Sequence, residues 1–216
     1  MKPVRLMVAI AIVASFVACI MDHSVGAPPD LSPAAAVAMN GPSSSALPSF
    51  VVIDPAAPAI ANPVITFWAK RGVESIVYMN FLPRPGHSTG DQFLRFRVRK
   101  KSLAFYPNGT PFAFGDSVQI TITLTDAINQ IVDFQPSGLV FSTANPADLK
   151  LSFLEADHDF NQDGVVNDVD AALVATFKVW RLHPPNPWKS QPSVVNGSIE
   201  EVETKVFSFT SYAIAY

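Results

Sequence analysis

The sequence contains little charge and almost no cysteine. Only 15% of its 216 residues are charged, and a net charge of −3 favours neither nucleic-acid binding nor a disordered acidic tail. Cys19 is the single cysteine, so an internal disulfide is excluded. The motifs of common enzymes (G-x-S-x-G, H-E-x-x-H, the phosphate loop and the dinucleotide fingerprint) are also missing. We therefore expect a protein that is not an enzyme and does not bind nucleic acid.

Residues 1–18 are typical of a signal peptide, with Lys2 and Arg5 before an apolar run that is too short for a membrane span of roughly 20 residues. The run ends at Ala18-Cys19, which resembles the bacterial lipobox, where the cysteine is cleaved and acylated. An ordinary signal-peptidase cut near Ala27 is the alternative. The sequence predicts export, lipidation of Cys19 and attachment to a membrane of the cell envelope or to the outer cell surface.

Residues 19–49 form the predicted lipid anchor and linker. They are rich in Ala, Pro and Ser, as in Ala27-Pro28-Pro29 and Ser43-Ser44-Ser45. Such a composition buries too little apolar surface to offset the entropy lost on ordering. We therefore expect a disordered tether that holds a folded domain of residues 50–216 clear of the membrane.

Beyond residue 50, apolar and polar residues alternate, as expected for strands with one face in a core and the other in water. This period of two occurs at residues 65–67, 77–81, 94–98, 118–124, 149–153 and 212–216. Turn signals separate the runs, among them Pro107-Asn108-Gly109 and Asn196-Gly197. The pattern predicts an all-β fold, an antiparallel sandwich or barrel with at most a short helix.

The stretch from about Leu103 to Phe153, together with Tyr212-Ala213-Ile214, resembles the ZU-five-type β-sandwich of ankyrins, netrin receptors, tight-junction scaffolds and bacterial surface relatives. The most specific part is Pro136-Ser137-Gly138-Leu139-Val140-Phe141. The resemblance implies a β-sandwich that acts as a structural or interaction module without a cofactor. Some relatives cleave themselves at His-Phe-Ser, but Ser208-Phe209-Thr210 here lacks the histidine that would activate the hydroxyl. We therefore expect an uncut chain.

The strongest chemical signal is an acidic loop at residues 159–170, which matches the twelve-residue calcium-loop pattern. Short oxygen-bearing side chains fall at alternate positions, Gly164 falls at the sharp turn, and an acid closes the loop. We expect the apolar Val166 to hold the loop against its neighbours. The predicted calcium ligands are Asp159, Asn161, Asp163, the Val165 carbonyl, Asn167 and Asp170.

The same loop resembles that of dockerin modules, which carry two such loops, whereas this sequence has one. A solvated acidic loop without a metal is the alternative interpretation. Residues 171–177 are compatible with a short exit helix or with a strand. The fold prediction is therefore an antiparallel β-sandwich with one calcium-loop insertion.

A basic cluster and one tryptophan suggest a second function. Arg95, Arg97 and Arg99 share one face of a predicted strand, either as a patch for anionic lipid or glycan or as a solvated outer face. Trp188 lies in a proline-bounded loop and could stack on a sugar. The first prediction is a calcium-binding surface module with a protein or glycan partner, and the alternative is an accessory carbohydrate- or envelope-binding domain.

Overall fold

The computed structural model describes residues 47–183 and 186–216. The predicted signal peptide, Cys19 and the linker up to residue 46 lie outside the described residues. The chain divides into a unit of residues 1–42 and a compact unit of residues 43–216, and the fold below is that of the second unit. Within the described part, no helix has the length and apolar character needed to cross a membrane.

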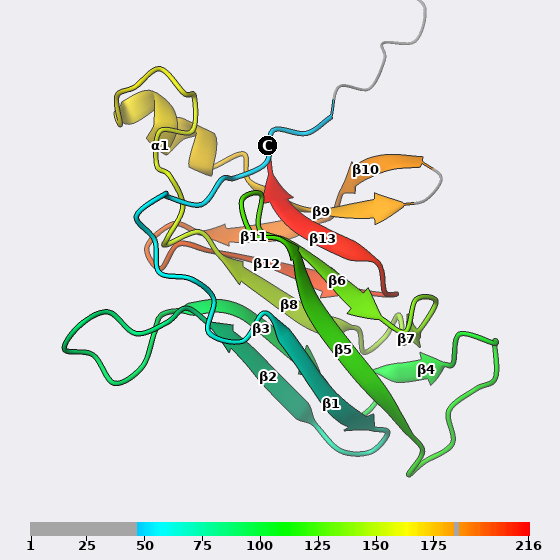
Figure 1. The fold of residues 1–216 in the computed structure, drawn as a ribbon. Coiled ribbons are helices and arrows are strands. Elements are labelled where there is room, and N and C mark those ends of the chain that lie inside the picture. Colours follow the sequence, from blue (N-terminus) through cyan, green and yellow to red (C-terminus); the bar gives the residue numbers. More distant parts are fainter. Residues whose placement is uncertain (1–46, 184–185) are drawn as a thin grey trace, which may run out of the picture. The chain divides into compact units, whose positions relative to one another are not determined.

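The described residues form strands and one short helix, α1 (Figure 1). In chain order they are β1 (Val64–Lys70), β2 (Ser75–Asn80), β3 (Gln92–Val98), β4 (Leu103–Phe105), β5 (Ser117–Asp126), β6 (Ile131–Gln135), β7 (Val140–Phe141), β8 (Ala147–Ser152), α1 (Asp168–Val174), β9 (Lys178–His183), β10 (Asn186–Ser190), β11 (Ser193–Asn196), β12 (Glu201–Val206) and β13 (Ser211–Ala215). Each run of alternating residues noted above falls on one of these strands, which confirms the all-β prediction.

The strands build two antiparallel sheets that face each other. One has the order β1-β5-β6-β13-β9-β10 and the other the order β11-β12-β8-β3-β2, while β4 and β7 form a separate pair. Ile120 and Ile122 of β5 are fully buried, and Thr121 between them lies on the outer face, hydrogen-bonded to Thr66 of β1 at 3.1 Å. The alternation therefore separates a core face from a solvent face, and the predicted antiparallel sandwich is confirmed.

Aromatic rings fill the space between the sheets. Phe96 of β3 meets Phe134 of β6 across the core, with ring centroids 5.1 Å apart. Phe209 packs against both of them, at 5.7 Å and 5.2 Å, and Phe141 packs against Phe96 and Phe209. Burial of each such ring contributes about 1.5–3 kcal/mol, so this cluster holds the two sheets together.

Residues 49–60 form an N-terminal strap along one side of the sheets. Ser49 pairs with Tyr216 through two backbone hydrogen bonds, of 3.2 and 3.0 Å, and the Val51 amide donates to Ile214 at 3.0 Å. Val51 is buried among core residues. The strap then passes Ile53, whose amide donates to the Ile128 carbonyl at 3.0 Å. The first described segment is thus fastened to the last strand, β13.

Two local features differ from the sequence-based expectation. Helix α1 begins at Asp168, inside the predicted loop, because Asn167 accepts the Val169 amide as an N-cap and Asp170 completes a capping box. Strand β10 was not predicted, since Pro187 suggested a loop. It forms at the edge of the larger sheet, and its pairing with β9 shifts register between Asn186 and Lys189, so the missing proline N–H is tolerated there.

Candidate metal centre

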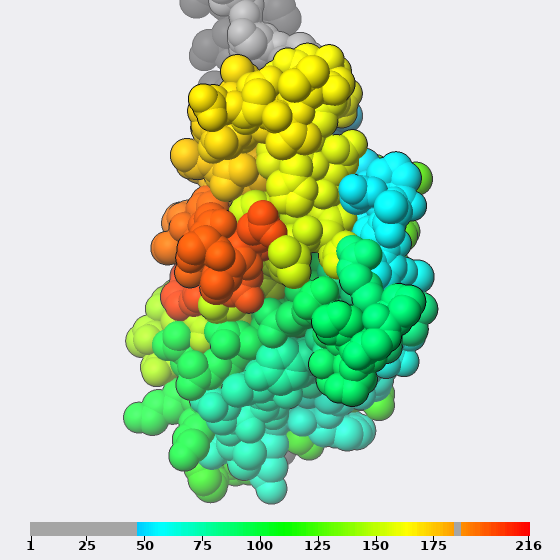
Figure 2. All heavy atoms as spheres, turned by 90° about the vertical axis from the view of Figure 1, so that its left-hand side faces the viewer, coloured from blue at the N-terminus to red at the C-terminus, as the bar shows by residue number. Residues whose placement is uncertain are grey.

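The acidic loop lies between β8 and α1, at the end of the sandwich where β13 ends (Figure 1). Figure 2 shows the atoms of the loop and α1 in yellow, exposed at one end of the folded unit. Phe160 attaches the loop to the core, and its side chain is only 5% exposed. The Phe160 ring packs edge-on against Phe177 at 4.9 Å, and its carbonyl accepts a hydrogen bond from the Tyr216 hydroxyl. The loop is therefore held to the core at its second residue.

The anchor residue differs from the predicted one. Val166 was expected to hold the loop, but it is 65% exposed, and Val165 beside it is 60% exposed. Phe160 carries out this role instead, because a larger aromatic side chain reaches the cluster of Phe153, Phe177 and Tyr216. The calcium-loop pattern does not define an apolar residue at this position, so the sequence carried no signal for it.

Asp159 organises the first half of the loop. Its Oδ1 accepts the Asp163 amide at 3.0 Å, and its Oδ2 accepts the Gly164 amide at 2.7 Å. Gly164 has a φ of +86°, a left-handed conformation that glycine adopts without steric cost. The Asn161 Oδ1 also accepts the Asp163 amide, at 3.1 Å. The chain thus turns tightly around the carboxylate at position 1, as the predicted pattern requires.

Asp170 closes the loop from its other end. Its Oδ1 accepts the Asn161 amide at 3.1 Å, its Oδ2 accepts the Asn167 amide at 2.9 Å, and the residue is 2% exposed. The Asn167 amide stabilises the carboxylate form, burial opposes it, and the other amides reinforce it, so that the pKa of Asp170 is lowered. Asp170, the last predicted ligand, is therefore ionised at neutral pH and held by the backbone of two other predicted ligands, Asn161 and Asn167.

Two side-chain amides lie between the remaining predicted ligands. The Asn161 Nδ2 donates to Asp163 Oδ2 at 2.8 Å, and the Asn167 Nδ2 donates to the Val165 carbonyl at 3.0 Å. These N–H groups therefore point at two of the oxygens expected to bind the ion. A 180° rotation of each amide would present its oxygen instead, but it would also break the hydrogen bonds that Asn161 Oδ1 and Asn167 Oδ1 accept from the Asp163 and Val169 amides, at 3.1 and 2.7 Å.

The structure brings all six predicted ligands into one compact turn. Among the described residues, no three acidic, histidine or cysteine side chains converge to hold a metal by themselves. A cation would therefore depend on the Asn amides and the Val165 carbonyl as well as on the carboxylates. An all-oxygen set of this kind suits the hard cation Ca²⁺, so the residues present fit the predicted ion.

The loop has a negative charge that protein cations do not balance. No lysine, arginine or histidine within residues 47–183 and 186–216 forms an ion pair with Asp159, Asp163 or Asp170. The effect reaches Tyr216, whose pKa is raised by burial and further by the charges of Asp170 and Asp159. The loop therefore presents an uncompensated negative potential.

The predicted basic cluster is, in contrast, largely neutralised. Arg99 Nε lies 2.8 Å from Asp148, and Arg97 Nη2 lies 2.6 Å from Glu74. Asp148 also forms an ion pair with Lys205 of β12, on the other side of β8, with Nζ 2.6 Å from Oδ1. The arginines share one sheet face as predicted, where Arg97 and Arg99 are ion-paired and Arg95 forms no ion pair in the described structure.

The other predicted candidates lie in structural contacts. Trp188 packs edge-on against Phe50 of the strap, with centroids 5.2 Å apart. Ser208 accepts a 2.6 Å hydrogen bond from Arg181, and the Thr210 hydroxyl donates to the Leu182 carbonyl at 2.9 Å. Cys19 lies outside the described residues.

No protein family, curated protein or solved structure matches this chain. The resemblances to ZU-five-type domains and to dockerin loops therefore stay predictions from the residues that carry them.

Proposed function

We propose that residues 50–216 form a non-enzymatic structural or interaction module at the cell surface, stabilised by one calcium ion. Asp159, Asn161, Asp163, Asn167 and Asp170 would hold the ion through side-chain oxygens, and Val165 through its carbonyl. The calcium supplies positive charge and directional bonds to oxygen. The chain supplies a prearranged turn that keeps these oxygens together.

The observation that carries the proposal is the pair of carboxylates at the two ends of the loop. Asp159 and Asp170 are each fixed by two backbone amides, and no protein cation of the described residues pairs with them. Carboxylates held together without a counter-charge repel one another. A divalent cation would remove that repulsion, at the cost of the two amide rotations and of the hydrogen bonds that Asn161 and Asn167 accept from the Asp163 and Val169 amides.

The role expected for calcium is stabilisation rather than switching. A single loop closed by an aspartate favours a Kd on the order of 10⁻⁴ to 10⁻³ M, the range of extracellular modules. A ten-fold excess over Kd then adds about 1.4 kcal/mol by mass action. For a domain of this size we expect a rise in Tm of about 3–5 °C. Magnesium should stabilise less, because it retains its waters and requires a smaller octahedral site.

Calorimetric titration and thermal unfolding of the purified protein test this proposal. We expect millimolar calcium to produce heat and to raise Tm, and Asp159→Ala to abolish both effects. Magnesium at equal concentration serves as the control for ionic strength. Unchanged heat and unchanged Tm in calcium would show that the loop is only acidic.

The proposed surface location depends on Cys19. We expect the exported protein to partition into detergent and Cys19→Ser to release or mislocalise it, because a lipobox cysteine carries the lipid chains. A mature N-terminus near Ala27, found by mass spectrometry, would contradict the anchor and leave the calcium proposal intact.

A further inference from the structure

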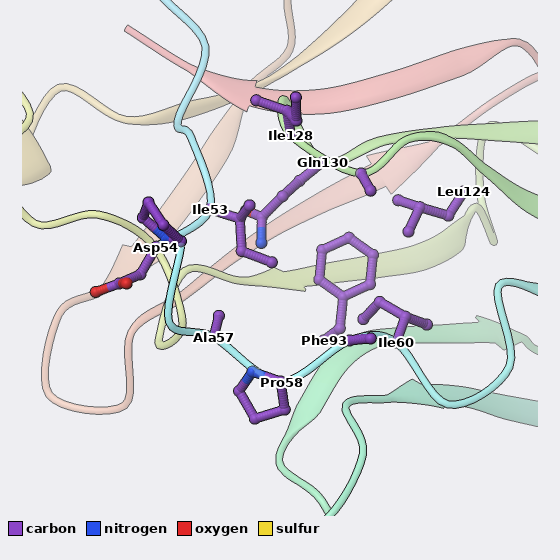
Figure 3. Close-up of a pocket in the computed structure, with 12 residues that line it drawn as sticks. Ile53, Asp54, Ala57, Pro58, Ile60, Phe93, Leu124, Ile128 and Gln130 are labelled. Carbon is purple, nitrogen blue, oxygen red and sulfur yellow. The ribbon is translucent and has the colours of Figure 1, made fainter.

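An apolar pocket of about 240 Å³, partly open to solvent, lies between the two sheets and the N-terminal strap (Figure 3). Phe93 of β3 contributes from one sheet and Leu124 of β5 from the other, while Ile53, Pro58 and Ile60 of the strap cover it. A cavity of about 150 Å³ is enough for a benzene ring. This one therefore has room for a ring and a small substituent.

A single buried polar side chain enters this apolar space. Gln130 is 3% exposed, and both of its amide atoms, Nε2 and Oε1, are buried without a hydrogen-bond partner among the described residues. Figure 3 shows its amide nitrogen between Ile53 and Phe93. The carboxylate of Asp54 points away from the cavity and accepts the Ala56 amide at 2.6 Å. Gln130 is thus the polar group that faces the cavity, and it offers one donor and one acceptor side by side.

The backbone fixes Gln130 in this position. It ends the turn between β5 and β6 with a φ of +51°, where glycine or asparagine is usual. The turn is rigid, because the Asp126 carboxylate accepts the amides of Ile128 at 2.9 Å and Asn129 at 3.0 Å. An unfavourable φ and an unpaired buried amide at the same residue are both costs to stability, and such strained positions gather at functional sites.

The strap forms one wall of the pocket. It is tied at one end by Asp54 N–H to the Glu155 carbonyl, 2.9 Å, and at the other by Leu82 N–H to the Ala59 carbonyl, 2.7 Å. Between these ties the backbone hydrogen bonds found in the described structure are local, such as Ala57 to Asp54 at 2.9 Å. A ligand can therefore enter from the open side, and a shift of residues 55–58 to accommodate it would break no sheet hydrogen bond.

We propose that this cavity binds a small neutral ligand with an apolar body and a carboxamide-like head, which pairs with the Gln130 amide. A primary amide presents a donor and an acceptor in one plane and satisfies both Gln130 atoms at once. A carboxylate offers acceptors only, and an ammonium group offers donors only. Either charged group would also lose its hydration in an apolar cavity. The site is separate from the calcium loop and does not depend on the proposed function.

The test compares two probes of similar shape, benzamide and cumene, on the purified full chain and on Gln130→Met. Methionine keeps the length of the side chain and the same backbone position but removes the amide, so it is a matched control. In an NMR titration we expect Gln130→Met to weaken benzamide binding about ten-fold, the loss of two hydrogen bonds of ordinary net strength. Cumene binding should stay equal or become tighter.

A second measurement uses only the wild type, so it tests the proposal even if Gln130→Met does not fold. Benzamide should shift the side-chain NH₂ resonances of Gln130 downfield, as expected for a new hydrogen bond, whereas cumene should not. Equal effects of the substitution on both probes, or no benzamide-specific shift at Gln130, would overturn the proposal and leave Gln130 hydrated by water only.

Discussion

Asp148 and Asp170 are equally buried carboxylates, each 2% exposed, and they are stabilised in opposite ways. Asp148 lies on the outer face of the smaller sheet and accepts hydrogen bonds from Arg99, at 2.8 and 2.9 Å, and from Lys205 at 2.6 Å. Asp170 lies in the acidic loop and accepts only backbone amides in the described structure. The charge of Asp148 is neutralised by side chains of this chain, while that of Asp170 is stabilised by backbone amides but not neutralised.

The comparison shows that a surface with many charged side chains requires no bound cation when those side chains balance one another. On the sheet face, Glu74, Glu201 and Glu203 pair with cationic residues of neighbouring strands, so most of the charge there is balanced. In the loop, amides fix the geometry of the carboxylates and leave their charge in place. That remaining charge is the reason the loop, and not the sheet face, is the candidate cation site.

The largest expected effect is the loss of the neutralised carboxylate. Asp148→Ala leaves Arg99 without its carboxylate partner and leaves Lys205 with Glu203 alone, at 3.1 Å. Breaking a buried pair costs about 3–5 kcal/mol, and since these two side chains are 38% and 44% exposed, we expect about 2 kcal/mol. Urea unfolding should give the same loss in calcium and in chelator. A loss that depends on calcium would erase the distinction between the two regions.

Asp170→Ala should have a smaller effect on the folded protein and remove its calcium response. The variant loses the closing ligand and the acceptor of the Asn161 and Asn167 amides, so Tm should fall by a few degrees even in chelator. The additional rise of about 3–5 °C in calcium should disappear. Thermal unfolding in calcium and in chelator measures both effects, and an unaltered calcium increment would exclude Asp170 as a ligand.

Acid should weaken both regions in the same pH range. For Asp148, burial raises the pKa, but hydrogen bonds from Lys205 and Arg99 outweigh it and lower the value, while amides lower the pKa of Asp170. A lowered pKa in the folded state gives stability that is present above the ordinary value of 3.8 and is lost as the pH falls through the folded value.

Asp148→Asn and Asp170→Asn should therefore flatten the fall of the urea midpoint below about pH 4. The two midpoints are to be followed from pH 7 to pH 2.5 in chelator. If the urea midpoint of either variant falls with pH as steeply as that of the wild type, the carboxylate replaced in it does not contribute to the loss of stability in acid.

The smallest effect is expected for Asp168→Ala, the matched control in the loop. Asp168 lies in the first turn of α1, at a position that supplies no ligand in the calcium pattern. Asp168→Ala removes the same charge as Asp170→Ala. The only stabilising interaction that it removes is that of an acidic side chain with the helix N-terminus, which contributes less than about 0.5 kcal/mol. The calcium-induced rise in Tm should be close to that of the wild type. A complete loss would indicate that net charge, and not ligand geometry, attracts the ion.

The strands were predictable because local alternation determines which face is buried. Ile120 and Ile122, or Leu94 and Phe96, reveal their core face without knowledge of their partners. Likewise, the spacing of Asp159, Gly164 and Asp170 identifies the loop, since its hydrogen bonds are formed within twelve consecutive residues.

Contacts between distant segments could not be predicted in this way. The pairing of Asp148 with Arg99 and Lys205 depends on the order of β3, β8 and β12, which no local pattern encodes. Phe160 reaches Phe177 and Tyr216 only after the fold has formed. Gln130 resembles any turn glutamine in the sequence, and its unpaired amide becomes visible only when the strap covers it.

The pairing of the strap with β13 has a mechanical consequence. Ser49 and Tyr216 lie at the same end of an antiparallel pair, with Phe50 opposite Ala215. A pulling force applied between residues 49 and 216 therefore loads these hydrogen bonds one after another, as in unzipping, whereas shear would load them together. We expect the strap to peel away at low force while the sheets stay intact, and a pulling experiment with a single high-force rupture would refute this. Since the Tyr216 hydroxyl also donates to Phe160, tension on the chain would reach the acidic loop before it reaches the core.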